Sequence, residues 1–320
     1  MSVFDTFEAF ADIDELVEKL LDSDAGVRQI AVLELSESGD PAALPHLLDA
    51  LRDSDPEVRL QAAKGLEEYD EPDAASALAK VLADENIEVA QAAAYSLSEF
   101  KNPQNVGSLI PFAKDGNPFV RQSILRGLKG LRSEVSLKTA LSALSDREAA
   151  VRIQAVGVLG YLKLNSALPA LMSATRDEDT QVRCTALGAL GFAAPATVDD
   201  TLINAMSDTE WPVREIAAET IGKIKLRSAA STLINAMADD YWQVRVKAAR
   251  SLGLIKVSEG VVALAGALTH DISNLRKEAA AALGEIAHLD ALPYLEGARD
   301  DPDPDVRKNV VWAIDRIKTA

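Results

Sequence analysis

Arginine and aspartate recur along this chain at fixed intervals, and together they could form a ladder of charge-assisted hydrogen bonds. Successive arginines are 31 or 62 residues apart, at Arg28, Arg59, Arg121, Arg152, Arg183, Arg214, Arg245, Arg276 and Arg307. An aspartate column runs six residues ahead of this register, with His270 as its exception, at Asp22, Asp53, Asp84, Asp115, Asp146, Asp177, Asp208, Asp239 and Asp301. Because both columns share one period, we interpret them as ion pairs at the turn of every repeat and not as a binding array.

Few residues have the types and spacing that catalysis or metal binding requires. Cys184 is the single cysteine, so neither an internal disulfide nor a cysteine metal cage is expected. A helical cysteine with no histidine placed near it is typical of an inert thiol. The histidines His46, His270 and His288 stand in no His-Glu dipeptide, and no P-loop, dinucleotide fingerprint or nucleophile elbow occurs. We therefore expect no catalytic residue, no metal site and no enzyme activity.

The spacing of apolar residues predicts the helices that carry the charged columns. Counted from each arginine, positions +3, +4, +7 and +10 are apolar except for Ser38, which describes one face of an α-helix. Leucine at position −12 marks an earlier helix in nine of the ten repeats. N-caps of the second helices are predicted at Asp24, Asp55, Asn86, Asn117 and Asp179, with Pro56, Pro118 and Pro304 in first turns. Each repeat is therefore two antiparallel helices that bury their apolar faces by stacking on their neighbours.

Segments such as DSDPEVRLQAAKGLEEYDEPDAASALAKVL (53–82) and DDYWQVRVKAARSLGLIKVSEGVVALAGAL (239–268) resemble the short HEAT-like repeat named after phycobilin lyases. The resemblance covers residues 12–320. It implies an all-α fold, a right-handed α-α superhelix (solenoid) of ten HEAT-like two-helix repeats. It leaves the function open, because chromophore lyase subunits, scaffolds and assembly factors share the repeat.

Charge is concentrated at one end of the chain. The net charge is −17; residues 1–100 carry 24 acidic and 6 basic side chains (net −18), and residues 101–320 carry 26 and 27 (net +1). The solenoid thus divides into acidic repeats (12–100) and near-neutral repeats (101–320). Glu37, Glu68 and Glu99, all at position +9, would repel nucleic acid and anionic membrane and steer a basic protein surface. The alternative is an acidic end that only keeps the protein soluble.

Two further regions depart from the regular pattern. Residues 1–11 precede the first repeat as an N-terminal cap or tail, in which Phe4, Phe7 and Phe10 either cover the open apolar face or dock elsewhere. Ala90 interrupts the arginine column, and the following segment 100–107 contains a proline and a glycine, so we expect local softening there. No apolar run approaches the roughly 20 residues that cross a bilayer, and the start of the chain lacks the basic stretch of a signal peptide. A cytoplasmic protein is expected.

The family resemblance also implies that the second helices line the concave face, with positions +1, +2, +5 and +9 pointing into it. These positions lie off the apolar stripe of the helix. In the middle repeats they form a patch of aromatic, glycine and polar residues: Tyr95, Gln122, Arg126, Ile153, Gly157, Tyr161, Cys184, Gly188 and Phe192. Clustered apolar groups in water favour a binding pocket. The alternative is that Tyr161 and Phe192 only fold over the next repeat.

A second aromatic cluster lies at position −3, where Trp211 and Trp242 stand in successive repeats and Tyr241 stands beside the second. Stacked one repeat apart on the turn ridge, the two tryptophans would form an exposed strip of the type enriched in interface hot spots. The alternative is that each ring packs on its own turn.

These patterns favour a non-catalytic interaction scaffold or assembly chaperone that holds a protein partner in the concave groove and needs no cofactor. The alternative, implied by the resemblance, is a cofactor-handling protein in which Tyr95, Tyr161 and Phe192 stack a bilin or other tetrapyrrole. The sequence predicts neither the identity of the partner nor the oligomeric state.

Overall fold

The computed structural model of the chain describes residues 13–319, which form ten pairs of helices joined by short turns. The first helices of the pairs are α1 (Ile13–Lys19), α3 (Leu44–Ala50), α5 (Pro72–Val81), α7 (Val106–Leu109), α9 (Leu137–Ala143), α11 (Leu168–Ala174), α13 (Pro195–Ala205), α15 (Ala230–Ala236), α17 (Val261–Ala267) and α19 (Leu292–Gly297). The second helices are α2 (Ala25–Glu37), α4 (Pro56–Gly65), α6 (Ile87–Glu99), α8 (Pro118–Leu131), α10 (Ala149–Leu162), α12 (Thr180–Ala189), α14 (Trp211–Lys223), α16 (Trp242–Ile255), α18 (Ser273–Ile286) and α20 (Pro304–Thr319). No strand occurs between residues 13 and 319, and the predicted α-solenoid of two-helix repeats is confirmed. The predicted cap of residues 1–11 lies outside the described residues.

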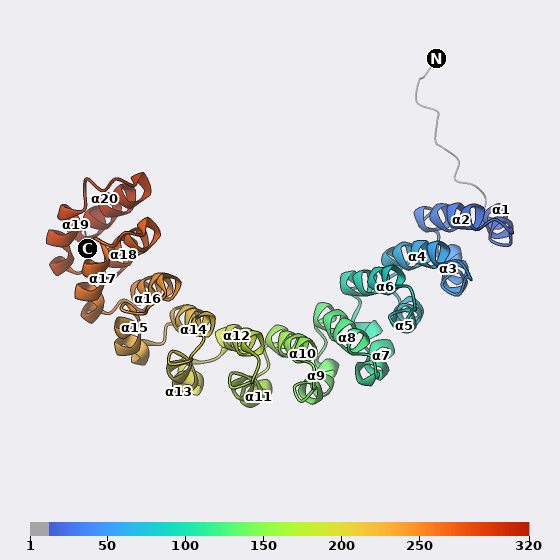
Figure 1. The fold of residues 1–320 in the computed structure, drawn as a ribbon, viewed down its shortest axis with the longest axis horizontal. Helices are drawn as coiled ribbons and strands as arrows, with labels where there is room; N and C mark the ends of the chain where they lie inside the picture. Colours follow the sequence, from blue (N-terminus) through green and yellow to red (C-terminus); the bar gives the residue numbers. More distant parts are fainter. Residues whose placement is uncertain (1–12, 320) are drawn as a thin grey trace, which may run out of the picture. The chain divides into compact units, whose positions relative to one another are not determined.

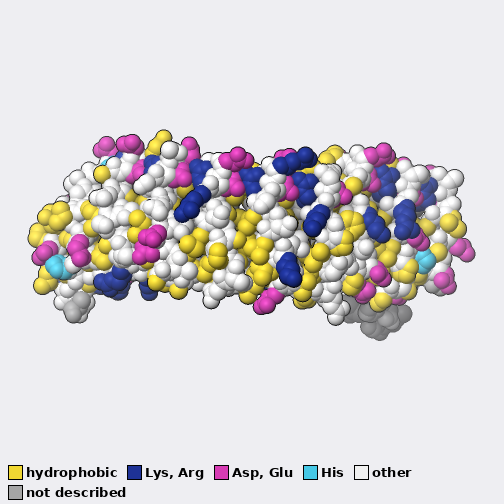
Figure 2. Space-filling model, turned by 90° about the horizontal axis from the view of Figure 1, so that it is seen from below, with side chains coloured by type: hydrophobic (Ala, Val, Ile, Leu, Met, Phe, Trp, Pro, Cys, Tyr) yellow, Lys and Arg dark blue, Asp and Glu magenta, His cyan; other side chains and the backbone are white. Residues whose placement is uncertain are grey.

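The repeats form two compact units, unit 1 (residues 1–162) and unit 2 (residues 163–320). Within each unit the second helices lie side by side in one layer and the first helices in another (Figure 1). Consecutive second helices pack on each other, as α2 does on α4 in unit 1 and α16 on α18 in unit 2. We call the exposed side of the second helices the second-helix surface of that unit. Figure 2 shows hydrophobic, basic and acidic side chains intermixed on the face that it views.

The core consists of the columns that the repeat predicted. The position +7 leucines and isoleucines and the position −12 leucines of the described repeats are 0–1 % exposed. Fully burying one such side chain stabilises the fold by about 1.5–3 kcal/mol. The position +3 alanines, from Ala31 to Ala279, are 0 % exposed, and their small side chains let neighbouring helices approach closely. Each repeat therefore completes its core only with the next one.

Local side chains fix where the second helices begin. Asp24 accepts a hydrogen bond from the backbone N of Gly26 at 2.7 Å, and the other predicted N-caps, Asp55, Asn86, Asn117 and Asp179, accept equivalent bonds. These contacts satisfy backbone donors that have no partner inside the helix. The N-cap predictions are confirmed.

The C-terminal ends show a feature that the sequence analysis did not predict. Position +11 adopts the left-handed region with φ of 50–57° at Arg132, Lys163, Lys225, Lys256 and Ala287. In the first repeat the same position is Gly39, at φ 61°. An L-residue with a side chain pays about 1 kcal/mol or more for this conformation, so these ends hold side chains where glycine would be less strained.

The segment that begins at Phe100 is tied to the preceding repeat. Asp70 Oδ2 accepts hydrogen bonds from the backbone N of Lys101 and of Asn102 at 2.6 and 2.8 Å. Asp70 Oδ1 accepts one from Asn105 Nδ2 at 2.5 Å, and Phe100 is buried. These contacts oppose the local softening that the proline and glycine of this segment suggested.

Candidate functional site

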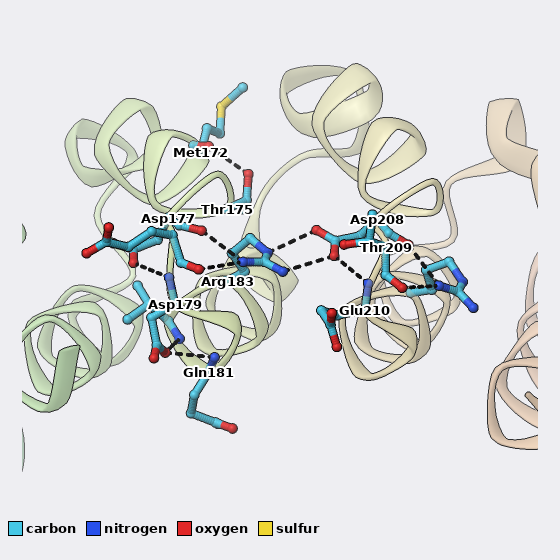
Figure 3. Close-up of polar contacts among 12 residues, drawn as sticks. Met172, Thr175, Asp177, Asp179, Gln181, Arg183, Asp208, Thr209 and Glu210 are labelled. Carbon is cyan, nitrogen blue, oxygen red and sulfur yellow. Dashed lines mark hydrogen bonds and ion pairs between the residues drawn. The ribbon is translucent and has the colours of Figure 1, made fainter.

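The arginine and aspartate columns meet at the turns between the helices, as Figure 3 shows around Arg183. Arg183 Nε and Nη2 donate to the two carboxylate oxygens of Asp208, one repeat on, at 2.9 and 3.0 Å. Its Nη1 donates to the backbone carbonyls of Asp177 and Glu178 at 3.0 and 3.1 Å. The same pairing joins Arg28 to Asp53, Arg59 to Asp84, Arg121 to Asp146, Arg214 to Asp239 and Arg276 to Asp301. The structural interpretation of the two columns is therefore confirmed.

The ladder pairs are charged and largely removed from water. The side chains of Arg121 and Asp146 are 9 % and 12 % exposed. The hydrogen bonds from Arg121 hold the pKa of the Asp146 carboxyl below its ordinary value, and in return the pKa of Arg121 is raised. Arg59 lowers the pKa of Asp84 in the same way. The charged form of each partner is stabilised by the other, as expected for a structural ion pair. The hydrogen bonds between these groups occupy the positions that a ligand would need.

The ladder is interrupted at Ala90. This residue is buried and has no guanidinium to offer the next aspartate, Asp115. The Asp115 carboxylate accepts a hydrogen bond from the backbone N of Asn117 and has no ion pair within the described part of the chain. The joint between these two repeats therefore lacks the ladder ion pair and relies on apolar packing and on the hydrogen bonds of Asp70.

The ladder is altered at His270, which stands in the aspartate column. Arg245 Nη1 lies 3.0 Å from His270 Nε2, and the backbone N of Ile272 donates to His270 Nδ1 at 3.1 Å. A neutral imidazole has only one acceptor nitrogen, so it cannot satisfy both donors. Arg245 Nε is buried and finds no partner among residues 13–319. This joint of unit 2 is weaker than its neighbours.

The predicted patch is divided between the two units, and its unit 1 part lies on the second-helix surface of α6, α8 and α10. Tyr95 on α6 is 55 % exposed and Tyr161 on α10 is 52 % exposed. Arg126 on α8 is also exposed. The remaining predicted members of this part, Gln122, Ile153 and Gly157, are half-buried. The surface therefore offers two aromatic rings and a guanidinium to a partner.

Two cations flank the ring of Tyr161. Lys129 Nζ lies 5.7 Å and Arg132 Cζ 5.5 Å from the ring centroid, both within the range of a cation–π interaction. A Cβ at Gly157 would lie 3.3 Å from Lys129 Cδ. Glycine at this position thus leaves room for the lysine stem to lie against α10, which gives the predicted Gly157 a packing role.

A hollow of about 510 Å³ opens beside this ring and is here called the Tyr161 hollow. The charged and aromatic side chains that line it are Glu99, Lys101, Arg126, Lys129, Arg132 and Tyr161. Four cations thus face one carboxylate. The volume lies within the range of about 300–1,000 Å³ that is typical of ligand sites.

The unit 2 part of the predicted patch is less open. Cys184 is buried at 9 % exposure, and burial raises the pKa of its thiol, so the prediction that it lies on the exposed surface is wrong. Its helix α12 packs beside α14, which covers a position that single-helix geometry leaves open. Phe192 is half-buried, and Gly188 is exposed with open space beside it.

The ridge cluster of unit 2 is a stacked pair of a different composition from that predicted. Trp211 stacks on Tyr241 with ring centroids 5.5 Å apart and an interplanar angle of 17°, so the ring that Trp211 meets is Tyr241, which the prediction placed beside the two tryptophans. The Arg214 guanidinium carbon lies 5.8 Å from the centroid of the Tyr241 ring. Tyr241 and Trp242 are 45 % and 38 % exposed. Arg214, three residues after Trp211, pairs with Asp239, and Tyr241 follows Asp239 by two residues. The ion pair therefore brings the Tyr241 ring close to the Trp211 ring.

The acidic residues predicted to steer a partner are all exposed: Glu37, Glu68 and Glu99. Glu37 and Glu68 line a second hollow of unit 1, of about 810 Å³, together with Lys64. These three carboxylates are therefore accessible to a charged partner in solution.

Metal clusters and membrane-spanning helices are both absent from the described residues. No group of three or more His, Cys, Asp or Glu side chains could hold a metal ion there. No helix from α1 to α20 is long and apolar enough to cross a membrane.

The stacked helix pairs and their ladder define a helical repeat protein of the solenoid class. The family model for HEAT repeats matches the chain at residues 13–98, 77–148, 137–199, 169–243 and 230–315. The chain belongs to the HEAT repeat family. No curated protein shows significant sequence similarity to it.

Solved structures share the fold. Kap95p, whose structure is described with RanGDP, has a TM-score of 0.65 and 17 % identity over 97 % of this chain and 50 % of its own length. The YibA protein of Escherichia coli has a TM-score of 0.63 and 22 % identity, covering 84 % of this chain and 98 % of its own. Kap121p, bound to the extreme C-terminus of the protein phosphatase Cdc14p, has a TM-score of 0.60 and 16 % identity, covering 95 % and 41 %. The chain thus spans half or less of the two karyopherins, and at these identities the similarity shows the fold alone.

Sequence reasoning missed the basic side of the Tyr161 hollow. Lys101, Lys129 and Arg132 were not singled out, although Lys101 and Arg132 both stand at position +11. Reading that column along the chain would have found a row of cations at the C-terminal ends of second helices.

Proposed function

We propose that this chain is a cytoplasmic, non-catalytic interaction scaffold or assembly chaperone that holds a protein partner on its second-helix surface. Tyr95, Arg126 and Tyr161 of unit 1 form the centre of the contact. The observation that carries the proposal is the exposure of both tyrosine rings, 55 % and 52 %, on one layer of neighbouring helices. Tyrosine and arginine are the residue types enriched in binding hot spots, and exposed rings that cluster mark interaction surfaces.

The structural neighbours support an interaction role by analogy of fold. Kap95p and Kap121p are described with protein partners, RanGDP and the extreme C-terminus of Cdc14p. Fold does not by itself carry function, so the assignment depends on the exposed residues of this chain.

Charge and the ridge extend the proposed contact. The exposed Glu37, Glu68 and Glu99 would guide a basic region of the partner towards unit 1, because complementary charge raises the association rate. The ridge of Trp211, Tyr241 and Trp242 supplies a second aromatic contact on unit 2.

Affinity capture from the native cell, read by quantitative mass spectrometry, tests the proposal. Tyr95→Ala and Tyr161→Ala should each reduce recovery of the same partner strongly, because loss of a hot spot of about 2 kcal/mol weakens binding about 30-fold. Tyr294→Ala is the matched control, since Tyr294 is 48 % exposed but lies on the first helix α19. Unchanged partner recovery by both test variants would show that the second-helix surface is not the contact.

The same eluate tests the cofactor-handling function of phycobilin lyase subunits. In that function the exposed rings of Tyr95 and Tyr161 would stack a tetrapyrrole, and the eluate would absorb visible light. A spectral change on adding bilin or haem, lost in Tyr161→Ala, would favour it over the scaffold.

A further inference from the structure

The Tyr161 hollow holds cations that the fold itself does not use. The side chains of Arg126, Lys129 and Arg132 make no ion pair and no hydrogen bond with any described residue, although Lys129 and Arg132 lie against the Tyr161 ring. Lys101 donates to the backbone carbonyl of Ser98 at 3.3 Å and is the one cation of the hollow with a hydrogen-bond partner of its own. Glu99 is the single carboxylate, so the lining carries an excess of three positive charges.

On the second-helix surface of unit 2, several cations form ion pairs with glutamates of an adjacent repeat. There Lys247 pairs with Glu219 at 2.7 Å, and Arg250 pairs with Glu278 at 3.2 Å. Lys256 reaches Glu285 at 3.5 Å. The repeat can therefore pair a glutamate with a cation of the adjacent repeat, whereas Glu99, which lines the Tyr161 hollow, forms no ion pair with the cations there. The free cations there are a local property of the sequence and not a consequence of the architecture.

One of these cations is held at a conformational cost. Arg132 has φ 50°, in the left-handed region that glycine adopts without strain. The helix C-terminus of α8 offsets part of the cost by attracting the positive charge. The same conformation recurs at position +11 in Lys163, Lys225, Lys256 and Ala287, so it sets where the Arg132 side chain lies and is not peculiar to the hollow.

We infer that the Tyr161 hollow binds a protein segment that carries clustered oxyanions, either carboxylates of aspartate and glutamate or phosphate esters. Two guanidinium groups and an ammonium group match such oxyanions through charge-assisted hydrogen bonds. The hollow of about 510 Å³ has room for several side chains of a segment. The exposed Tyr95, at the same register position on α6 as Arg126 on α8, adds an aromatic contact beside it.

A nucleic acid fits this surface less well than a peptide. Nucleic-acid binding uses an extended basic track with many phosphate contacts. Here four cations gather in one hollow and do not form a long track, and the same unit carries all 24 acidic side chains of residues 1–100. The inference rests on the proposed function and deepens it, because it names the chemistry of the partner segment that meets Tyr161.

Fluorescence anisotropy on the purified full chain tests the inference with two labelled probes. One is a glutamate-rich peptide, and the other is a phosphoserine peptide of the same net charge. Wild type should bind at least one of them at low salt, more weakly at physiological salt, because exposed charges are screened. Binding of only one probe identifies the oxyanion as carboxylate or phosphate, and the unphosphorylated serine peptide should not bind.

Substitutions separate loss of binding from loss of fold. Arg132→Gly removes a cation and relieves the left-handed strain, so it should weaken binding about fivefold to tenfold while the unfolding midpoint rises. Lys225→Gly is the matched control, since Lys225 has φ 57° and is exposed on unit 2, and it should leave binding unchanged. Arg126→Gln, at an exposed helical position, should weaken binding by a similar factor without strain relief.

Three results would overturn the inference: no binding of either peptide, equal binding by wild type and both test variants, or displacement of the peptides by a single-stranded RNA that binds more tightly. These results are distinguishable from failure of the proposed function. If the peptides do not bind but Tyr161→Ala still loses the cellular partner, the scaffold proposal stands without the anion site. If the peptides bind but partner capture is unaffected, the site stands and the scaffold proposal fails.

Discussion

Replacing His270 by aspartate should stabilise the protein, because it restores the ladder at its altered step. In the wild type, Arg245 Nε is buried without a partner among the described residues, and the imidazole faces two donors. An aspartate would accept from Arg245 Nε and Nη2 and from the backbone N of Ile272, as Asp301 accepts from Arg276 and from Asp303. Hydrogen bonds to charged groups contribute about 1.5–3 kcal/mol each before desolvation of the new carboxylate is subtracted. We expect a net gain of about 2 kcal/mol, which is about 4–8 °C in the unfolding midpoint of a unit of this size.

Thermal unfolding of the full chain at neutral pH, followed by circular dichroism, measures this gain. His288→Asp is the matched control, because His288 is exposed and belongs to neither column, and its effect should stay within about 0.5 kcal/mol. In an Arg245→Met background the gain from His270→Asp should disappear. A midpoint that does not rise, or that rises equally without Arg245, would refute the explanation.

Three further outcomes follow from the ladder and the packing. Acid should destabilise the fold below about pH 4. The pKa of a ladder carboxyl such as that of Asp146 is lower in the folded chain than in the unfolded chain. Its contribution to stability is therefore complete above the unfolded pKa and is lost as the pH falls through the folded pKa. Asp146→Asn should therefore show a shallower loss of urea stability between pH 5 and 3 than wild type, and an equal slope would contradict this. Gly253→Ala should lower the free energy of unfolding by about 1–3 kcal/mol, because the added Cβ would lie 2.8 Å from Ala282 Cα. Gly266→Ala, where the added Cβ meets open space, should raise the free energy of unfolding measured in urea. Ala287→Gly should raise the free energy of unfolding by about 1 kcal/mol, because Ala287 has φ 55° at the C-cap of α18. Ala281→Gly, inside α18, should lower it by about as much. If calorimetry shows both changes in the same direction, the strain argument is wrong.

The period of the sequence predicted the helices, the caps and the core, because the same local pattern is repeated along the chain and each repeat tests the others. The ladder was predicted as well, but not which carboxylate each arginine would choose. The structure shows that Arg183 uses the carboxylate of the next repeat and the carbonyls of its own turn. That choice depends on how far one repeat lies from the next, which a one-repeat pattern does not contain.

The candidate site was predicted only in part. Tyr95, Arg126 and Tyr161 are exposed as their register implied. The burial of Cys184 depends on the neighbouring helix, which the register of one helix cannot give. The position of Arg132 beside Tyr161 depends on a left-handed residue, and nothing in the type arginine signals a positive φ.

Site-specific photocrosslinking tests the central claim, that the second-helix surface of unit 1 holds a protein partner. A benzophenone amino acid would replace Tyr161 in one variant and Tyr294, exposed on the first helix α19, in another. On irradiation in the native cell, position 161 should crosslink to one abundant protein, and an excess of the anionic peptide should reduce the yield. Position 294 should give little of that product. Equal crosslinking from both positions, or none from position 161, would contradict the account.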